Sequence, residues 1–391
     1  MDTAALKSSW EQVAKCGDDV PLFFYSHLFL SHPELREMFP ISMAGQRDKL
    51  VGALGRIVSN VDDLPEVTPF IQQLGRDHRR FDVVAQHYSA VGSSLLVTLK
   101  HFLGAAWTDE LAADWSAAYG IIARVMVEAA EESSESTPSS WDAEVLEADR
   151  RTMDVSVVRI RTHQPYSFQP GQSFAMEIEQ RPRLWRYYSP ANAPREDGTI
   201  DLHVQLVDGG QVSGPLVRTV RPGDTMRLGA AVGDQLTLRE GDRRDLVMVA
   251  GGTGLAPLSA VVDQLDQEWQ ATGSGPQVHL FHGARVPWNL YERDRLKDLA
   301  SSRPWFDYTE VVSDDPSYPG PRGMVGSVAA RAGSWHGRVA MVCGGPQMVT
   351  HTVQELVRAG IPAEDVRYEQ FQDVGAGDTA DADGSRTGDP Q

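Results

Sequence analysis

The spacing of apolar residues changes twice along this 391-residue chain, and each change predicts a different kind of domain. Up to about residue 132 the apolar residues recur at steps of three and four, as in the segment 50–61, which is typical of amphipathic helices. From residue 141 they alternate with polar residues, as in the segment 200–206, which indicates strands of an antiparallel sheet. Beyond about residue 245 apolar strands alternate with loops and helices, the pattern of a doubly wound parallel sheet.

These periods predict a multidomain fold with an all-helical domain, an antiparallel β-barrel and a doubly wound α/β domain. A polar, acidic segment that contains a proline separates the first two domains and has the composition of a linker. The C-terminal segment has almost no large apolar residue, and we expect it to be a disordered acidic tail. The predicted boundaries are 1–132 for the helical domain, 133–140 for the linker, 141–240 for the barrel, 241–371 for the α/β domain and 372–391 for the tail.

The composition excludes several classes of protein. A formal charge of −18 would repel the phosphate backbone of a nucleic acid, so no nucleic-acid partner is expected. No apolar run approaches the roughly 20 residues that span a bilayer, and the N-terminus lacks the basic flank and apolar stretch of a signal peptide. We therefore expect a cytoplasmic protein with no stable membrane insertion. The two cysteines, Cys16 and Cys343, cannot build a disulfide framework or a four-cysteine iron–sulfur site.

A histidine occupies an apolar position in the segment "LGRDHRRFDVV", residues 74–84. Val67, Ile71, Leu74 and His78 follow one another at steps of four, three and four, so they share one face of the predicted helix. Two interpretations stay open at this point. The side chain is either a core histidine hydrogen-bonded to a carbonyl or a metal ligand.

Two glycine-rich loops follow predicted strands of the α/β domain, and each precedes a predicted helix. They are "VAGGTGLAP", residues 249–257, and "CGGPQM", residues 343–348. Glycines let a backbone approach a pyrophosphate, and a helix N-terminus offers free N–H donors and a favourable dipole. Because the carboxyl ends of parallel strands are where such sheets bind ligands, the pair of loops favours a nucleotide site over two ordinary tight turns.

The barrel segment "RYYSPANAP", residues 186–194, has residue types that suit a flavin. Arg186 can hold a phosphate, Tyr188 lies two residues later on the same strand face, and Ser189 offers a hydroxyl. The segment "GGQVS", residues 209–213, offers further backbone N–H groups. The alternative is an exposed strand followed by a turn.

The order of these motifs resembles that of the ferredoxin-reductase type of FAD and NAD(P)H module. The motifs "RYYS", "GGQVS", "GGTGLAP", "CGGPQM" and the closing "YEQF" cover residues 141–371 as an ordered set. The resemblance implies a module that takes a hydride from NADH or NADPH and releases electrons singly. It implies FAD contacts at Arg186, Tyr187, Tyr188, Ser189, Gly210, Gln211, Val212, Ser213, Glu369 and Phe371, and nucleotide contacts at Gly252, Thr253, Gly254, Leu255, Ala256, Pro257, Cys343, Gly344 and Gly345.

Such a module needs an electron acceptor, and two cysteines cannot ligate an iron–sulfur cluster. The helical domain with His78 is the remaining candidate. Its segments "FFYSHLFLSHPELREMFPIS" (23–42), "GQRDKL" (45–50) and "DHRRFDVVAQHYSAVGSSLL" (77–96) resemble the globin domain of flavohaemoglobins.

By this resemblance the helical domain has the globin fold and binds haem b. His78 is the expected iron ligand. His87 competes with it but is expected to point outward, because it precedes an apolar stripe that starts at Tyr88. The other expected residues are Tyr25 and Gln46 in the distal pocket, Phe39 and Leu50 against the porphyrin, and Tyr88 in a proximal hydrogen-bond network.

Three positions depart from the family pattern. Ala130 stands where the family has a glutamate partner for Tyr88, Asp77 replaces a basic residue before the iron ligand, and Ser173 replaces a tyrosine that touches FAD. A carboxylate on the proximal side makes an imidazole more electron-donating. Without it, we expect a weaker push of electron density toward bound oxygen.

The expected function is that of an NAD(P)H-dependent oxidoreductase, a flavohaemoglobin that acts as a nitric oxide dioxygenase on O2 and NO. Two alternatives stay open: a divergent reductase with another donor or acceptor, and a haem-based redox or oxygen sensor. Arg285 can meet the 2′-phosphate of NADPH or be a solvated strand-end residue, so both nucleotides stay open as well. We expect small-molecule partners and a monomer or weak dimer.

Overall fold

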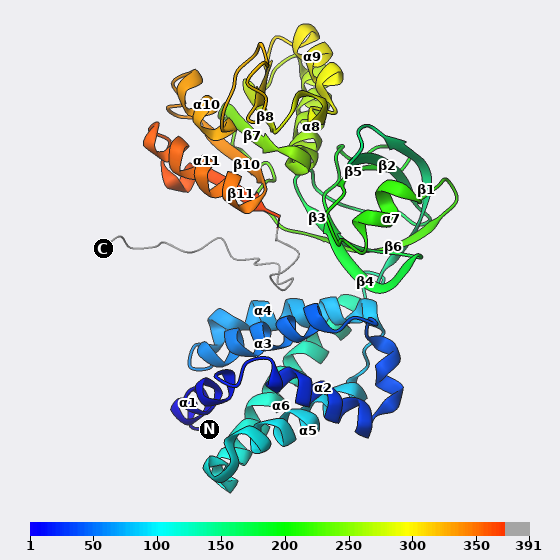
Figure 1. Ribbon diagram of the computed structural model, residues 1–391, viewed down its shortest axis with the longest axis vertical. Coiled ribbons are helices and arrows are strands. Elements are labelled where there is room, and N and C mark those ends of the chain that lie inside the picture. The colour runs from blue at the N-terminus through cyan, green and yellow to red at the C-terminus, as the bar shows by residue number, and fades with distance from the viewer. Residues whose placement is uncertain (372–391) are drawn as a thin grey trace. The chain divides into compact units, whose positions relative to one another are not determined.

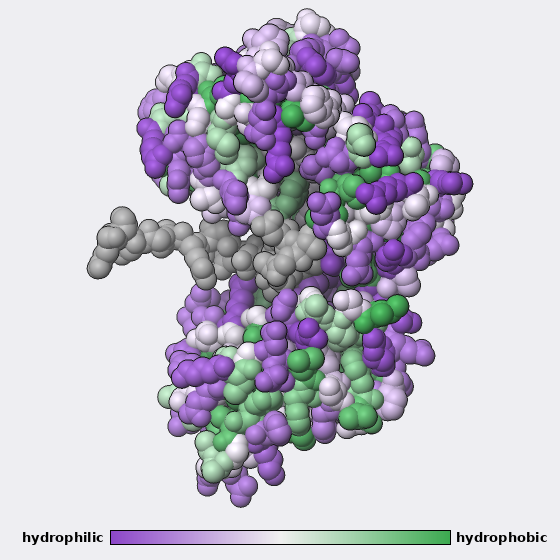
Figure 2. All heavy atoms as spheres, in the orientation of Figure 1, coloured by the Kyte–Doolittle hydropathy of each residue, from purple (hydrophilic) through white to green (hydrophobic). Residues whose placement is uncertain are grey.

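The computed structural model describes residues 1–371, which form two compact units that divide between Ser140 and Trp141. The expected disordered tail, residues 372–391, lies outside the described residues. Figure 1 shows a helical first unit and a second unit that contains two sheets. Figure 2 shows hydrophilic and hydrophobic residues interspersed over the visible face of both units. Within residues 1–371, no helix combines the length and apolar character needed to cross a membrane.

The first unit is all helical, as the spacing of three and four predicts. Its long helices are α1 Thr3–Ala14, α2 Asp19–Ser31, α3 Ala44–Ser59, α4 Leu64–His78, α5 Ala85–Leu103 and α6 Asp109–Ser134. Short 3-10 helices cover Pro33–Met38, Arg79–Phe81 and Gly104–Ala106. Side chains cap several of the helix starts: Asp63, for example, accepts from the Glu66 amide at 3.4 Å, and Thr108 accepts from the Leu111 amide at 3.2 Å.

A glycine lets α4 and α6 cross at close range. A Cβ atom on Gly75 would lie 2.2 Å from the carbonyl oxygen of Met126, much closer than van der Waals contact. Val67 and Ile71, on the same helix, are each 2% exposed and pack with Met126 in one apolar cluster. Gly75 thus sets how closely the end of α4, which carries His78, approaches α6.

The first sheet of the second unit has six antiparallel strands in the order β4-β3-β6-β1-β2-β5. The strands are β1 Trp141–Arg150, β2 Val155–Thr162, β3 Ser173–Ile178, β4 Arg181–Tyr188, β5 Thr199–Gln205 and β6 Thr225–Val232. Their core includes Ile160, Phe174 and Leu202, and the short helix α7, Ser213–Arg218, adds Leu216 to it. Figure 1 shows the strands curled around α7, as expected of the antiparallel domain that the period of two predicts.

The second sheet has five parallel strands in the order β11-β10-β7-β8-β9. Along the chain the elements are β7 Leu246–Gly251, α8 Leu255–Thr272, β8 Val278–Ala284, α9 Arg293–Ser302, β9 Phe306–Val312, α10 Val325–Ala332, β10 Val339–Gly344, α11 Pro346–Arg358 and β11 Val366–Gln370. Helices α8 and α9 pack on one face of the sheet and α10 and α11 on the other (Figure 1). The strand order reverses at β7, so the loops after β7 and β10 border the crevice where such sheets bind ligands.

We expect Gly75→Ala to destabilise the helical unit by about 1 to 3 kcal/mol, because the added Cβ forces α4 away from α6. Gly120→Ala on α6 is the matched control: no atom lies within 4 Å of its added Cβ, so its higher helix propensity stabilises the unit by up to about 1 kcal/mol. Urea unfolding of the full-length protein, followed by far-UV circular dichroism, measures both changes. Equal stabilities for the two variants would contradict a close crossing at Gly75.

Candidate functional site

His78 ends α4 with one ring nitrogen fixed by its own helix. Its Nδ1 lies 2.6 Å from the carbonyl oxygen of Leu74, and because a carbonyl only accepts, Nδ1 carries the proton. The other nitrogen, Nε2, then holds a lone pair, and no described residue hydrogen-bonds to it. Burial lowers the pKa of His78, which keeps the ring neutral. A neutral imidazole with a free Nε2 is the form that ligates a metal.

The other candidate for the iron ligand, His87, is hydrogen-bonded to the backbone instead. Nδ1 of His87 accepts from the N–H group of Val84 at 3.3 Å, which caps the start of α5. Tyr88, the next residue, packs with Leu74 in the cluster that joins α4 and α6. Its hydroxyl makes no hydrogen bond with any described residue; the hydroxyl of Tyr119 donates instead to the Tyr88 backbone carbonyl at 2.7 Å.

The glutamates of α6 face away from this cluster. Glu128, Glu131 and Glu132 are exposed, while Ala130 is partly buried. Asp77 lies 3.4 Å from Arg80, which neutralises part of its charge. Within residues 1–371 the structure therefore does not form the proximal network that the resemblance implies for Tyr88.

Aromatic side chains gather around Tyr25 on α2. The centroid of its ring lies 5.8 Å from that of Phe29 and 5.6 Å from that of Phe39. Tyr25 is 6% exposed, and its hydroxyl donates to the backbone carbonyl of Gln46 over a long 3.3 Å. Burial raises the pKa of this hydroxyl, so it stays protonated. Tyr25 therefore points at the start of α3, where Gln46 and Leu50 are four residues apart on one helix face.

The helical unit contains apolar side chains that suit a flat apolar ligand. Phe39, Met43, Leu50, Leu54 and Val91 pack against its buried core, yet each keeps part of its surface exposed. Covering such surfaces with the faces of a macrocycle is favourable. Together with the free Nε2 of His78, these residues fit a haem group.

Arg186 and Tyr188 lie on one face of β4, next to β3. The Tyr188 ring packs against the core of the curled sheet, and burial raises the pKa of its hydroxyl. Arg186 donates to the carbonyl of Trp185 at 2.8 Å. Tyr187 and Ser189 are partly buried beside them. The strand thus presents a cation and an aromatic ring together, as a flavin dinucleotide requires.

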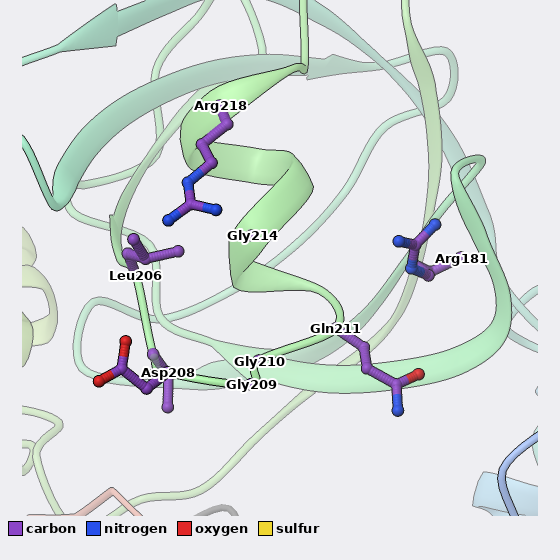
Figure 3. Close-up of a pocket in the computed structure, with 9 residues that line it drawn as sticks. Arg181, Leu206, Asp208, Gly209, Gly210, Gln211, Gly214 and Arg218 are labelled. Carbon is purple, nitrogen blue, oxygen red and sulfur yellow. The ribbon is translucent and has the colours of Figure 1, made fainter.

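A cavity of about 310 Å³ opens beside the glycine segment 209–211 (Figure 3). Arg218 reaches toward it from α7 and Arg181 from β4, on opposite sides of the glycines (Figure 3). A Cβ on Gly210 would lie 2.3 Å from the Ser213 hydroxyl oxygen, so glycine keeps this turn tight. Arginines and glycine amides are the groups that hold phosphates. The sequence motifs single out Gly210, Gln211, Val212 and Ser213 but not the two arginines.

The two glycine loops of the parallel sheet meet where its strand order reverses. A Cβ on Gly254 would lie 2.2 Å from the carbonyl oxygen of Cys343, so only glycine lets the loop after β7 approach the end of β10. Gly252 has a φ of +54°, which also favours glycine. The amide of Phe371 donates to the Gly344 carbonyl at 2.9 Å and places that aromatic residue beside the same loops.

Burial sets the protonation of two side chains near these loops. Cys343 is fully buried, and burial raises the pKa of its thiol well above the usual value. Burial, followed by the charge of Asp234, raises the pKa of Glu369 to about 7. Glu369 pairs in register with Cys343 across β10 and β11. Of the other residues predicted to contact the nucleotide, Thr253, Leu255, Ala256 and Pro257 are buried. Gly345, which directly precedes α11, is exposed.

The comparisons with known proteins cover all three predicted domains. A globin model matches residues 22–126, an oxidoreductase FAD-binding domain model matches 142–235, and an oxidoreductase NAD-binding domain model matches 248–354. The chain is 28% identical to the flavohemoprotein of Bordetella parapertussis over 77% of this chain and 78% of that protein. It is 25% identical to the flavohemoprotein of Halalkalibacterium halodurans over 96% and 99% of the two chains.

A solved structure supports the same fold over nearly the whole chain. The flavohemoglobin of Malassezia yamatoensis, whose structure holds FAD and heme, matches with a TM-score of 0.73 at 17% identity, over 95% of this chain and 98% of that one. A globin domain followed by FAD-binding and NAD-binding oxidoreductase domains defines an NAD(P)H-dependent oxidoreductase with haem and flavin cofactors. The chain belongs to the flavohaemoglobin family, whose domain series carries electrons from NAD(P)H through FAD to haem.

We expect His78→Ala to lose the haem Soret band and to keep flavin absorbance, because the free Nε2 is removed from one unit and the other is untouched. His87→Ala is the matched control and is expected to keep the Soret band, because its ring caps a helix. Absorbance spectra of the purified variants, loaded with haem, measure both. A normal Soret band in His78→Ala would overturn the assignment of the iron ligand.

We expect Glu369→Gln to raise the melting temperature of the full-length protein at about pH 8 and to change it little at about pH 4. The folded-state pKa of about 7 lies above the usual 4.5, so the stability that this carboxyl contributes is full below 4.5 and is lost as the pH rises through 7. Glu364→Gln, an exposed glutamate nearby, controls for the loss of one charge. The same change in melting temperature at both pH values would contradict the raised pKa.

Proposed function

We propose that the chain is a nitric oxide dioxygenase, which uses electrons from NADH or NADPH to convert nitric oxide and O2 to nitrate. In this proposal residues 1–132 hold haem b, 141–240 hold FAD and 241–371 hold the nicotinamide nucleotide. The main support for this proposal is the free Nε2 of His78. It lies in the same chain as FAD-binding and NAD-binding oxidoreductase domains. When bound, FAD supplies the splitting of a hydride into single electrons, and haem supplies an iron that takes up O2.

The residues of the helical unit prepare its pocket. The Leu74 carbonyl holds the proton on Nδ1 of His78 and so leaves Nε2 for the iron. The buried hydroxyl of Tyr25 stays protonated and would donate a hydrogen bond to an anionic oxygen in the pocket, a charge-assisted bond worth about 1.5 to 3 kcal/mol. Its bond to Gln46 is long at 3.3 Å, so a better-placed acceptor can replace that carbonyl.

The second unit supplies the electrons. Arg186, Tyr188, Ser189 and the segment 210–213 hold FAD, and Arg181 and Arg218 extend the phosphate site across the neighbouring cavity. The loops 252–257 and 343–345 hold the nicotinamide nucleotide at the reversal of strand order. Phe371, hydrogen-bonded through its amide to Gly344, is held beside these loops and would pack against the flavin.

One observation favours a second candidate, a flavohaemoglobin reductase that passes its electrons to another acceptor. The hydroxyl of Tyr88 has no partner among residues 1–371, and the glutamates of α6 are exposed. His78 therefore lacks the carboxylate support that makes an iron-bound imidazole more electron-donating. Weaker electron donation from the imidazole to the iron slows oxygen chemistry more than it slows simple electron transfer.

Nitrate yield separates the two candidates. With NADH and O2 the holoprotein is expected to form nitrate in proportion to the nitric oxide that it consumes. Tyr25→Phe is expected to slow this turnover at least about tenfold, because it removes a charge-assisted hydrogen bond. Tyr119→Phe, which removes another largely buried hydroxyl in the same unit, is the control and is expected to keep the wild-type rate. Nitric oxide consumption without nitrate would favour the second candidate, and an unaffected Tyr25→Phe would contradict the role of this hydroxyl.

A further inference from the structure

A buried polar network joins the two sheets of the second unit, and no motif of the sequence points to it. It begins at His203 on β5 of the curled sheet, which is 8% exposed. Nδ1 of His203 lies 2.9 Å from the hydroxyl of Tyr291, which comes just before α9 in the parallel-sheet domain. The two rings pack edge to face with centroids 5.2 Å apart. The hydrogen bond and the ring contact therefore tie one domain to the other.

The same tyrosine ring also contacts a second histidine, which lies on β8 of the parallel sheet. His282 is fully buried, and its ring lies edge to face with Tyr291 at 5.8 Å. Nε2 of His282 lies 3.2 Å from the carbonyl oxygen of Gly252, and Nδ1 lies 3.5 Å from the hydroxyl of Tyr308 on β9. The network thus ends on the first residue of the glycine turn that follows β7.

The chemistry of these partners fixes the protons. A carbonyl only accepts, so Nε2 of His282 donates to Gly252, and its Nδ1 accepts from Tyr308. Burial lowers the pKa of His282 to about 4 and that of His203 to about 3. Both rings therefore stay neutral at physiological pH, and the donor to Gly252 does not change.

The Gly252 carbonyl is a sensitive point of the turn. Gly252 has a φ of +54°, and two residues later Gly254 touches the backbone of Cys343 on the neighbouring strand. Turning the Gly252 carbonyl would rotate the peptide group that precedes Thr253 and change the direction of the amides that open α8. Those amides are the groups that face an anionic ligand.

We propose that His282 is a positioning residue for the nicotinamide nucleotide: it holds the Gly252 carbonyl and so orients the 252–254 turn, while Tyr291 and His203 anchor it to the curled sheet that carries the flavin motif. This inference rests on the assignment of residues 252–257 to the nucleotide. It adds a fully buried side chain that reaches the loop through the Gly252 carbonyl.

The test compares variants that differ in the donor at one position. His282→Leu removes the donor, and His282→Asn carries an amide on too short a side chain to reach Gly252. His282→Gln restores an N–H donor at the place of Nε2. We expect the dissociation constant of NAD⁺, measured by calorimetry on the FAD-loaded protein, to rise about threefold to tenfold in the Leu and Asn variants and to recover in the Gln variant. Amide hydrogen exchange of residues 252–258 is expected to quicken in the same two variants.

Two measurements separate positioning from general damage. Oxidation of the pre-reduced flavin by ferricyanide involves no nucleotide and is expected to keep its wild-type rate in every variant, while the KM for NADH follows the dissociation constant. His279→Leu changes a histidine on the same strand that bonds Thr309 instead, and is expected to bind NAD⁺ as the wild type does. Tyr291→Phe, which breaks the bond to His203, is expected to weaken NAD⁺ binding about twofold to fivefold.

The outcomes are distinct. If the wild type binds neither NAD⁺ nor NADP⁺, the assignment of the loop fails. If the wild type binds but the Asn and Leu variants bind equally well, or if Gln is as weak as Leu, the positioning role of His282 is overturned. If only Tyr291→Phe binds NAD⁺ as the wild type does, the anchoring role of Tyr291 is overturned, and the positioning of Gly252 by His282 is kept.

Discussion

The hydrogen bond between Nδ1 of His78 and the Leu74 carbonyl decides what the helical unit can do. It exists because α4 stays helical to its last residue, so a carbonyl one turn earlier faces the ring at 2.6 Å. It fixes the proton on one nitrogen and leaves a lone pair on the other. Gly75 supports the same geometry, because it lets the end of α4 lie directly on α6. The same unit holds a second buried donor, the hydroxyl of Tyr25, whose hydrogen bond to the Gln46 carbonyl is long at 3.3 Å. In the proposed function this hydroxyl would exchange that carbonyl for a ligand oxygen.

In the second unit the decisive constraint is topological. Because β7 lies between β10 and β8, the loops that follow β7 and β10 open side by side, and Gly254 lets their backbones touch. The C-terminal strand β11 then brings Phe371 to the same place through its bond to Gly344. The His282 network lies behind this edge and ties the turn to the curled sheet. In the proposed function, the nicotinamide nucleotide would therefore lie against one short stretch of glycine backbone.

Local features of the structure were predictable from the sequence, while features that depend on distant partners were not. Changes in the spacing of apolar residues along the chain predict all three folds. The sequence favours His78 over His87 through the apolar stripe that starts at Tyr88, but the Val84 amide that hydrogen-bonds to His87 becomes visible only in three dimensions. The contact of Gly75 with α6, the arginines of the cavity beside residues 209–211 and the His282 network join residues far apart in the chain. No periodicity encodes such contacts.

In the proposed function, electrons from the nicotinamide nucleotide reach iron held by His78 within one chain. An anaerobic mixture of the haem- and FAD-loaded protein with NADH under carbon monoxide tests it directly, with absorbance recorded through the flavin and Soret regions. We expect flavin bleaching to be followed by the Soret band of the ferrous carbon monoxide complex. Flavin that bleaches beside iron that stays ferric would contradict it.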